Sequence, residues 1–258
     1  MPTTPPTARL AILHGYGDHA GRHSHVLQWM ADHGIAAYAL DFRGHGHSAG
    51  KPVAILHWDE YLDDLKAFLA IEDLSNNQTP LFILGHSHGG LIAAAAAIRG
   101  LLNRARGIIL VAPYLELKMP IARAKWLAGF ILSHVLPKMP MKSGIDGPML
   151  TRDPQMAQDG NNDPLCRGIA TPRWYLETVK VQKQVREAAA RFNLPLLMLV
   201  PGDDTIANPH ANTAFFKACS STDKTIKHYP DSRHELLREI NRLDALDEVL
   251  RWIHHRQS

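Results

Sequence analysis

Cysteine is scarce in this sequence, and long apolar runs are missing from it. The 258 residues include two cysteines, Cys166 and Cys219, which are too few and too far apart to form a disulfide framework, so we expect a reducing compartment. No uninterrupted apolar stretch reaches the length of about 18 residues that marks a membrane-spanning helix. The first residues, MPTTPPTARLAILHG, carry no cleavable signal pattern. We therefore expect a soluble, cytoplasmic protein.

Basic and acidic residues are nearly balanced in number, and neither kind is concentrated in the chain as a whole. Lysine and arginine number 28 against 25 acidic residues, which gives a formal net charge of +3, and the basic residues are scattered. Nucleic-acid-binding domains gather such residues on one face, so we expect no nucleic-acid partner. Internal repeats and low-complexity tracts are also missing. With 45% hydrophobic residues, the chain can build the large core of a single α/β domain.

Short apolar runs alternate with helical patterns along the chain. The runs are continuous rather than alternating with polar residues, which is typical of parallel strands that are covered by helices on both faces. The repeated β-α-β order predicts a parallel, doubly wound sheet. The expected strands are residues 10–13, 35–40, 81–84, 108–111, 194–200 and, less clearly, 225–228, and the expected helices are residues 23–33, 58–72, 91–102, 209–219 and 235–254.

Residues 114–172 interrupt this alternation. They contain many prolines, a helical stretch at residues 121–136 and no clear strand. Insertions in α/β proteins sit on loops at the carboxyl ends of strands, where ligands bind. We interpret residues 114–172 as a cap over a site, and residues 1–113 and 173–258 as the core domain.

The strongest chemical signal is GHSHG at residues 85–89, between an apolar strand and the alanine-rich helix that follows. A nucleophile elbow needs this strand–G-x-S-x-G–helix context, because the serine occupies a tight, strained turn. Glycine at both ends keeps neighbouring backbones free of side-chain clashes. We predict that Ser87 is a nucleophile. The alternative is an ordinary glycine-rich turn at the end of a strand.

A second glycine-rich loop, HGYG at residues 14–17, directly follows the first predicted strand. An oxyanion hole needs two hydrogen-bond donors aimed at the developing negative charge. We assign these donors to the backbone N–H groups of Tyr16 and His88. Taken alone, the HGYG loop would equally fit an ordinary connection between strand and helix.

A serine nucleophile needs a base, and the base needs an acid that orients it. In α/β-hydrolases the order along the chain is serine, acid, histidine. Asp203 and Asp204 follow the fifth predicted strand, and His234 lies in the loop after the last one. His234 is therefore the predicted base, although a surface histidine at a helix start would give the same pattern. Spacing alone leaves the choice between the two aspartates open.

Taken together, these segments resemble the monoacylglycerol lipase and lysophospholipase branch of the α/β-hydrolases. The resemblance implies the α/β-hydrolase fold, a serine hydrolase acting on lipid monoesters, no cofactor and no metal. It also selects Asp204 as the acid, because in that family the acid directly precedes a residue and two aliphatic side chains. The matching segments are HGYGDHAGR (14–22), DFRGHGHS (41–48), GHSHGG (85–90), TRDP (151–154), NDPL (162–165) and DTIAN (204–208).

Two departures from the family pattern stand out. Family members begin with an extra β-hairpin before the strand that leads to the HGYG loop, whereas here only a short segment precedes that strand, so we expect the hairpin to be absent. The family often has methionine after the nucleophile, where this chain has His88. Its N–H can still serve the oxyanion hole, and we expect its side chain to alter the rim of the acyl pocket.

Two other classes of function compete with a serine hydrolase. The chain has 16 histidines, and the pairs His23/His25, His45/His47 and His86/His88 are spaced as zinc ligands can be. No acidic residue or third histidine follows the last pair, which argues against a catalytic metal. A non-catalytic binding protein on the same fold is the second alternative. Such proteins typically lack a member of the triad, and all three candidates are present here.

The stretch from residue 118 to 142 contains five basic residues and no acidic one. An aminopeptidase would need carboxylates there to hold a substrate amino group, so the stretch favours ester substrates over a proline-iminopeptidase-like activity. A short-chain carboxylesterase also remains an alternative, and nearby Asp146, Asp153 and Asp163 keep the peptidase open. The pairs Trp126/Phe130 and Leu127/Ile131 are spaced to share one helical face. Such a basic amphipathic helix predicts weak contact with anionic membranes, unless its apolar face packs on the domain.

Overall fold

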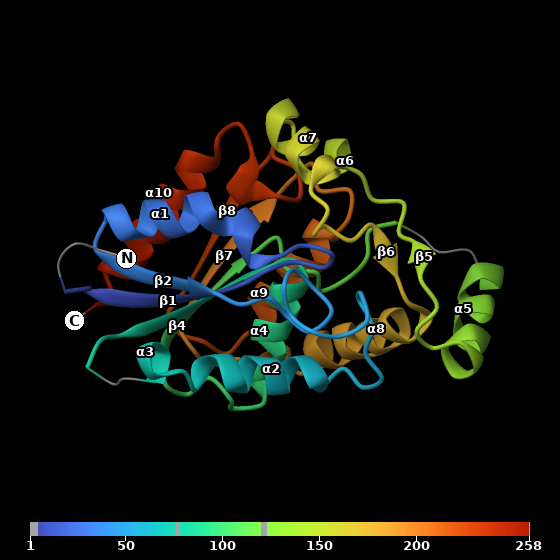
Figure 1. The fold of residues 1–258 in the computed structure, drawn as a ribbon. Helices are drawn as coiled ribbons and strands as arrows, with labels where there is room; N and C mark the ends of the chain where they lie inside the picture. The colour runs from blue at the N-terminus through green and yellow to red at the C-terminus, as the bar shows by residue number, and fades with distance from the viewer. Residues whose placement is uncertain (1–4, 76–77, 120–122, 258) are drawn as a thin grey trace.

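The computed structural model describes residues 5–75, 78–119 and 123–257, and its centre is a six-stranded sheet. All six strands run parallel, in the order β2-β1-β3-β4-β7-β8, as Figure 1 shows. Every predicted strand is present. The strands are β1 (Ala8–Leu13), β2 (Ile35–Ala39), β3 (Leu81–His86), β4 (Ala105–Val111), β7 (Leu196–Pro201) and β8 (Lys224–Tyr229).

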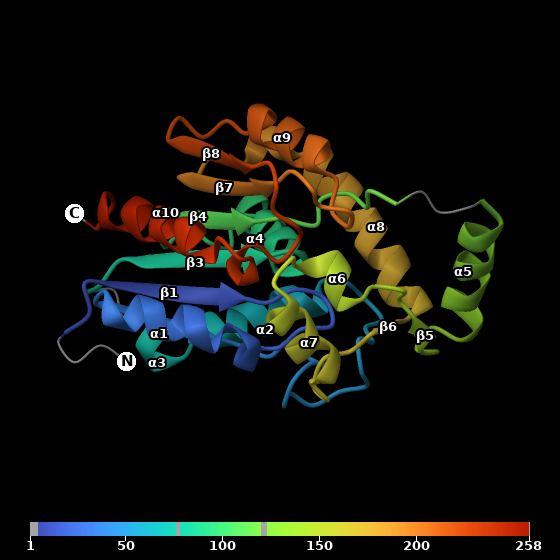
Figure 2. The ribbon, with the colours of Figure 1, turned by 90° about the horizontal axis from the view of Figure 1, so that it is seen from above.

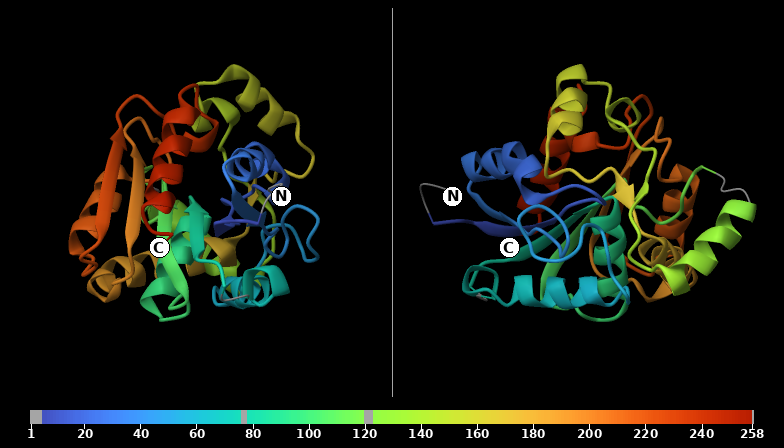
Figure 3. Two further views of the ribbon diagram at one scale, coloured as in Figure 1. Left: turned by 90° about the vertical axis from the view of Figure 1, so that its left-hand side faces the viewer. Right: turned by 45° about the vertical axis from the view of Figure 1, so that its right-hand side comes forward.

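Helices cover both faces of the sheet, which explains the continuous apolar runs (Figures 1 and 3). One face packs against α1 (Ser24–Asp32) and α10 (Arg242–His254), and the other packs against α2 (Glu60–Leu69), α3 (Glu72–Ser75), α4 (His88–Ile98), α8 (Pro172–Glu187) and α9 (Pro209–Ala218). Helix α4 is buried along its whole length. Its five consecutive alanines allow it to lie close to the sheet, directly behind the end of β3.

The structure corrects the sequence prediction at two helices. Helix α8 was not expected, and it follows the proline-rich segment directly. The helix predicted at residues 235–254 is divided into a 3₁₀ turn, Leu236–Arg238, and α10. At the break, the N–H of Ile240 donates to the side-chain carboxylate of Glu239, at 3.1 Å. A side chain that takes a backbone N–H in this way competes with helix propagation.

The segment between β4 and α8 lies beyond the carboxyl ends of the strands, as Figure 2 shows. It contains α5 (Arg123–Val135), α6 (Gly147–Leu150) and α7 (Pro154–Asn162). Residues 121 and 122 of the predicted helix lie outside the described residues. No strand was expected here, but β5 (Met141–Lys142) and β6 (Ile169–Ala170) form a short antiparallel pair. Two residues per strand are too few for a periodic sequence signal.

Strand β1 is the first strand of the described chain, and it lies between β2 and β3 inside the sheet. Residues 5–7 of the predicted leading segment precede β1 without a strand, while residues 1–4 lie outside the described residues. A search of the described helices for one long and apolar enough to cross a membrane found none. Two further 3₁₀ turns, Ala20–His23 and Ala189–Arg191, complete the elements.

Candidate active site

Ser87 sits in a strained turn between β3 and α4. Its φ of 52° and ψ of −116° place it in a region that side chains rarely adopt. The turn is held because the N–H of Ser87 donates to the carbonyl of Val111 and its carbonyl accepts from Leu91 and Tyr114. A Cβ on Gly85 would lie 2.5 Å from the carbonyl oxygen of Gly89, so the turn requires glycine there. The strand–turn–helix context that the sequence predicted is present.

The structure brings Ser87, His234 and Asp204 together, although they are far apart in the sequence. Nε2 of His234 lies 2.8 Å from the Ser87 hydroxyl, and Nδ1 lies 2.8 Å from the Asp204 carboxylate. All three side chains are buried. This arrangement fits a neutral imidazole that donates from Nδ1 to the carboxylate and accepts from the hydroxyl at Nε2.

Asp203 and Asp204 differ sharply in their surroundings. The side chain of Asp203 is 56% exposed and lies 3.5 Å from the Arg233 guanidinium. Asp204 has no exposed surface, and its second oxygen accepts the N–H groups of Ile206 and Ala207 at 2.8 and 2.9 Å. The geometry therefore places Asp204, rather than Asp203, against the imidazole.

The surroundings of His234 change the pKa of its imidazole. Burial by itself lowers the pKa of His234, but the charge and hydrogen bond of Asp204, with a smaller contribution from Glu235, raise it above the ordinary value. His86 lies beneath the ring and is hydrogen-bonded to the backbone carbonyl of His234, with 3.2 Å between Nε2 and the oxygen. Burial lowers the pKa of His86 to about 3, with His234 contributing. His86 is therefore neutral near pH 7, and its ring supports the His234 loop.

Tyr16 and His88, the predicted oxyanion residues, flank Ser87. The loop with Tyr16 follows β1 and lines the same cavity as Ser87. A Cβ on Gly89 would lie 2.1 Å from the Leu13 carbonyl oxygen, so glycine there allows the two loops to approach. His88 is the first residue of α4, and the first N–H groups of a helix have no partner within it. The loop of Tyr16 and the start of α4 therefore adjoin at Ser87, and the use of these two N–H groups as an oxyanion hole stays a prediction.

The side chain of His88 does not reach the pocket rim, contrary to expectation. His88 is only 2% exposed, and it does not line the cavity. Its ring packs against Tyr61 and Trp174, at centroid distances of 4.9 and 5.4 Å. Trp174, from the unexpected helix α8, also stacks on the Tyr16 ring at 4.3 Å. One aromatic side chain therefore contacts both residues whose N–H groups flank Ser87.

A cavity of about 680 Å³ opens above Ser87 and His234. Such a volume suits a small molecule of lipid size. Most of its upper wall comes from the segment between β4 and α8, and its apolar lining includes Leu117, Met119, Ile145, Leu150, Met156, Trp174 and Ile206. The Ser87 hydroxyl and the His234 imidazole face this mainly apolar cavity, while the Asp204 carboxylate is buried behind the imidazole.

A buried ion network beside the site escaped the sequence prediction. Arg22 donates to both carboxylate oxygens of Glu235, at 3.0 and 3.1 Å, and reaches Asp18 at 3.3 Å. Arg238 pairs with the same two acids. Burial alone would raise the pKa of Asp18, but Arg238, with His23 and Arg22, holds it well below its ordinary value. The network joins the loop of Tyr16 to the loop of His234. The HGYGDHAGR segment supplies Asp18 and Arg22, and the residues after His234 supply Glu235 and Arg238.

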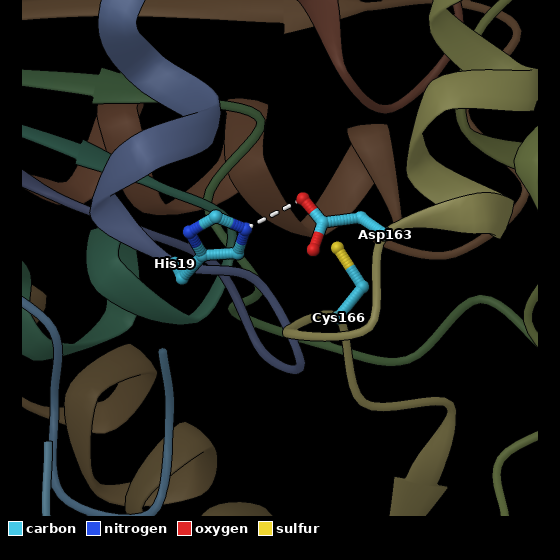
Figure 4. Close-up of side chains that lie close together, drawn as sticks. All are labelled: His19, Asp163 and Cys166. Atoms are coloured by element: carbon cyan, nitrogen blue, oxygen red, sulfur yellow. Dashed lines mark hydrogen bonds and ion pairs between the residues drawn. The ribbon is translucent and has the colours of Figure 1, made fainter. Parts of the chain in front are cut away.

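The three H-x-H pairs do not form metal sites among the described residues. His23 faces Asp18, His25 contacts the Leu237 carbonyl, and His45 contacts the Arg43 carbonyl. The group of potential ligands found in the described chain is a different one, His19, Asp163 and Cys166 (Figure 4). Neither cysteine is in a disulfide.

Comparisons with known proteins agree with this geometry. A family model described as serine aminopeptidase, S33, matches residues 4–241. The chain belongs to this family. The predicted α/β-hydrolase fold and the predicted serine hydrolase are thereby confirmed. The peptidase in the family's description is one of the alternatives that the sequence left open.

Individual proteins of known sequence or structure are also similar to this chain. A monoacylglycerol lipase of Mycolicibacterium smegmatis is 28% identical over 98% of this chain and 90% of its own length. An uncharacterized abhydrolase domain-containing protein of Dictyostelium discoideum is 29% identical over 99% of the chain, which spans 27% of that longer protein. The crystal structure of a Paleococcus ferrophilus monoacylglycerol lipase superposes with a TM-score of 0.89 at 23% identity, over 99% of this chain and 96% of that one. The Mycolicibacterium relative confirms the predicted resemblance to the monoacylglycerol lipase branch, and the superposition confirms the fold.

Proposed function

We propose that this protein hydrolyses carboxylic esters of lipids, with monoacylglycerols or lysophospholipids as substrates, through an acyl-enzyme on Ser87. One observation carries the proposal. The hydrogen-bonded series Asp204–His234–Ser87, with 2.8 Å at each step, lies at the floor of a mainly apolar cavity of about 680 Å³. The likeness to monoacylglycerol lipases supports the lipid substrate.

In this mechanism His234 removes the proton of Ser87 while the oxygen attacks the ester carbonyl. The carbonyl oxygen becomes negative, and the N–H groups of Tyr16 and His88 stabilise it. The tetrahedral intermediate expels the alcohol, which takes the proton from His234, and Ser87 keeps the acyl group. Water, deprotonated by His234, then attacks the acyl carbonyl and releases the fatty acid and the Ser87 hydroxyl. Asp204 holds the imidazole in the required tautomer throughout.

We assign the cap to residues 114–172 and the core domain to residues 1–113 and 173–258. The cap supplies Leu117, Met119, Ile145, Leu150 and Met156 to the cavity wall, while Ser87 and His234 come from the core. A roof of unbranched and branched aliphatic side chains favours an acyl chain over a small polar ester.

Helix α5 supports the predicted contact with a lipid surface. Trp126 and Phe130 stack on one another at 5.8 Å and are 45% and 43% exposed, while Leu127 and Ile131 are more than half exposed. About half of each of these apolar side chains is therefore left uncovered, although α5 also packs against α8. Lys138 and Lys142 are exposed nearby, and Lys118, also exposed, donates one hydrogen bond to the Asp204 carbonyl. Weak docking to anionic lipid is part of the proposed function.

A peptidase is the second candidate, because four carboxylates line the cavity. Three of them are already engaged: Asp18 and Glu235 with arginines, and Asp163 with His19. Asp146 caps α6 through the N–H of Met149. A substrate amino group would have to compete with these partners, which favours the ester.

A substrate panel separates these candidates. Initial rates would be measured on monoacylglycerols and lysophospholipids of increasing acyl length, short nitrophenyl esters, and aminoacyl-proline amides. We expect kcat/KM to rise with acyl length and to be highest for a medium- or long-chain lipid monoester. A preference for nitrophenyl acetate over every lipid would replace the proposal with a short-chain carboxylesterase. A preference for the aminoacyl substrates would replace it with a peptidase.

A further inference from the structure

Three potential metal ligands meet beside the cavity, outside the residues that the mechanism uses. Nε2 of His19, a carboxylate oxygen of Asp163 and Sγ of Cys166 all lie within 4.8 Å of one another. Figure 4 shows the three side chains converging, with His19 hydrogen-bonded to Asp163 at 2.8 Å. His19 is buried, whereas Asp163 and Cys166 are partly exposed and line the cavity. The cluster is therefore closed by the protein at His19 and open to the cavity at Asp163 and Cys166.

We propose that His19, Asp163 and Cys166 bind a zinc-like divalent cation, with a water or substrate oxygen in the fourth position facing the cavity. Imidazole, carboxylate and thiolate together are ligands that Zn²⁺ accepts, and three protein ligands plus one open position is a usual zinc arrangement. Zinc–ligand distances of about 2.0–2.3 Å require the three ligand atoms, which lie within 4.8 Å of one another, to adjust around the ion. A rotation of the partly exposed Cys166 side chain can supply such a movement.

The backbone already holds the ligands near these positions. Asp163 and Cys166 belong to one turn, closed by the Cys166 N–H donating to the Asp163 carbonyl at 3.1 Å. That turn is joined to the Tyr16 loop, since the Arg167 N–H donates to the Gly17 carbonyl at 2.7 Å. A Cβ on Gly17 would lie 2.5 Å from the Arg167 carbonyl oxygen, so the two segments are in close contact. An ion here would cross-link the HGYG loop to the cap.

Binding changes the protonation of two ligands. Nδ1 of His19 accepts the Gly21 N–H at 3.2 Å, so the ring carries its proton on Nε2 and donates it to Asp163. Coordination at Nε2 moves the ring proton to Nδ1 through solvent and breaks the 3.2 Å hydrogen bond from Gly21, so a small rotation of the ring must separate the two N–H groups. The Cys166 thiol releases its proton to water and binds as thiolate. No step of ester cleavage uses this ion. Its proposed role is to hold the HGYG loop and the cap together.

The test measures metal binding without any assay of hydrolysis. Protein purified without a histidine tag would be titrated with Cd²⁺ and Co²⁺, because thiolate ligation gives an ultraviolet charge-transfer band and tetrahedral Co²⁺ gives visible bands. We expect both signals in the wild type with one equivalent of metal. Cys166→Ser should abolish the thiolate band. His19→Gln and Asp163→Asn should weaken binding by about 100-fold or more, since even outer-shell partners of a ligand are worth 10–100-fold.

Cys219→Ser and His210→Gln are matched controls. Cys219 is the other free cysteine, and His210 is an exposed histidine outside the cluster. A thiolate band that persists in Cys166→Ser, or its absence from the wild type in excess Cd²⁺, would overturn the inference. If the variants misfold, an alkylation experiment on the wild type tests the metal site without them. Zn²⁺ should slow alkylation of Cys166, located by peptide mass mapping, and leave Cys219 unaffected, whereas equal alkylation with and without Zn²⁺ would contradict the site.

Discussion

Asp203 and Asp204 are adjacent at the end of β7, yet one is exposed and the other wholly buried against His234. Because the carboxylate fixes the imidazole tautomer, Asp204→Asn should lower kcat by about 10⁴-fold. Asp203→Asn loses only a partly exposed ion pair and should change kcat by less than about fivefold. Steady-state kinetics on one lipid monoester compares the two. Equal losses, or the reverse order, would show that the acid is assigned wrongly.

The raised pKa of His234 sets the pH dependence of hydrolysis. Protonated His234 cannot accept the Ser87 proton, so activity is lost as pH falls through the pKa of the imidazole. Since Asp204 raises this pKa, the acid limb of kcat/KM should lie above the ordinary histidine value of 6.5. Asp204→Asn should move the limb to lower pH while reducing the plateau. A limb below 6.5 in the wild type would contradict the environment described for His234.

Gly89 and Gly168 offer a matched pair for testing the elbow. A Cβ at Gly89 would press on the backbone carbonyls at the end of β1, whereas a Cβ at Gly168 would meet no atom within 4 Å. Gly89→Ala should therefore destabilise the fold by about 1–3 kcal/mol, or more, and also reduce activity by displacing His88. Gly168→Ala should leave the melting temperature nearly unchanged. Thermal unfolding of both variants measures this, and similar melting temperatures would mean that the loops are not so closely packed.

At the scale of elements, the strands were predictable because each is a continuous apolar run between turns. Helix α8 was missed although Trp174, Thr178, Val181 and Val185 recur at helical spacing and are buried. Threonine interrupts that stripe, and the rest of the helix is polar, so its apolar signal is weak. The break before α10 had no glycine or proline to mark it. It depends on the buried Glu239 carboxylate, which accepts the N–H of Arg152 from the cap and the N–H of Arg233 from the preceding loop.

Helix α5 carries the proposed contact with lipid. Removing both aromatic side chains, as Trp126→Ser with Phe130→Ser, should weaken binding to anionic vesicles about tenfold or more, since one buried aromatic contributes at least ~1.5 kcal/mol. Activity on vesicle-borne monoacylglycerol should fall with it, while activity on a soluble short ester should stay the same. Leu243→Ser, a similarly exposed apolar position on α10, is the control.

Vesicle co-sedimentation at low and high salt measures this binding. Wild-type recruitment should decline with salt, because the cations of the cap are screened. If the wild type ignores anionic vesicles at low salt, the docking part of the proposal fails and α5 serves only as part of the cap. An equal loss in Leu243→Ser would mean that the aromatic pair has no special role.

At the scale of the whole molecule, the candidate site combines parts that sequence order keeps far apart. Ser87, His234 and the pair Asp203/Asp204 could be named beforehand because each follows a strand, and parallel strands present their carboxyl ends at one edge. The choice of Asp204 needed the family resemblance. The Arg22–Glu235 pair and the His19–Asp163 contact could not, since 213 and 144 residues separate the partners and neither forms a local pattern. Such contacts depend on how loops pack after the sheet has assembled.

The most direct test of the whole account is the rate at which folded Ser87→Ala hydrolyses a long-chain monoacylglycerol. The substitution removes one oxygen from a site whose members act as a unit, so kcat should fall by about 10³–10⁶-fold relative to the wild type. The melting temperature should change little, because within the described residues the lost hydroxyl is hydrogen-bonded to His234 alone. Near wild-type hydrolysis by a folded Ser87→Ala protein would contradict the assignment of Ser87 as the nucleophile.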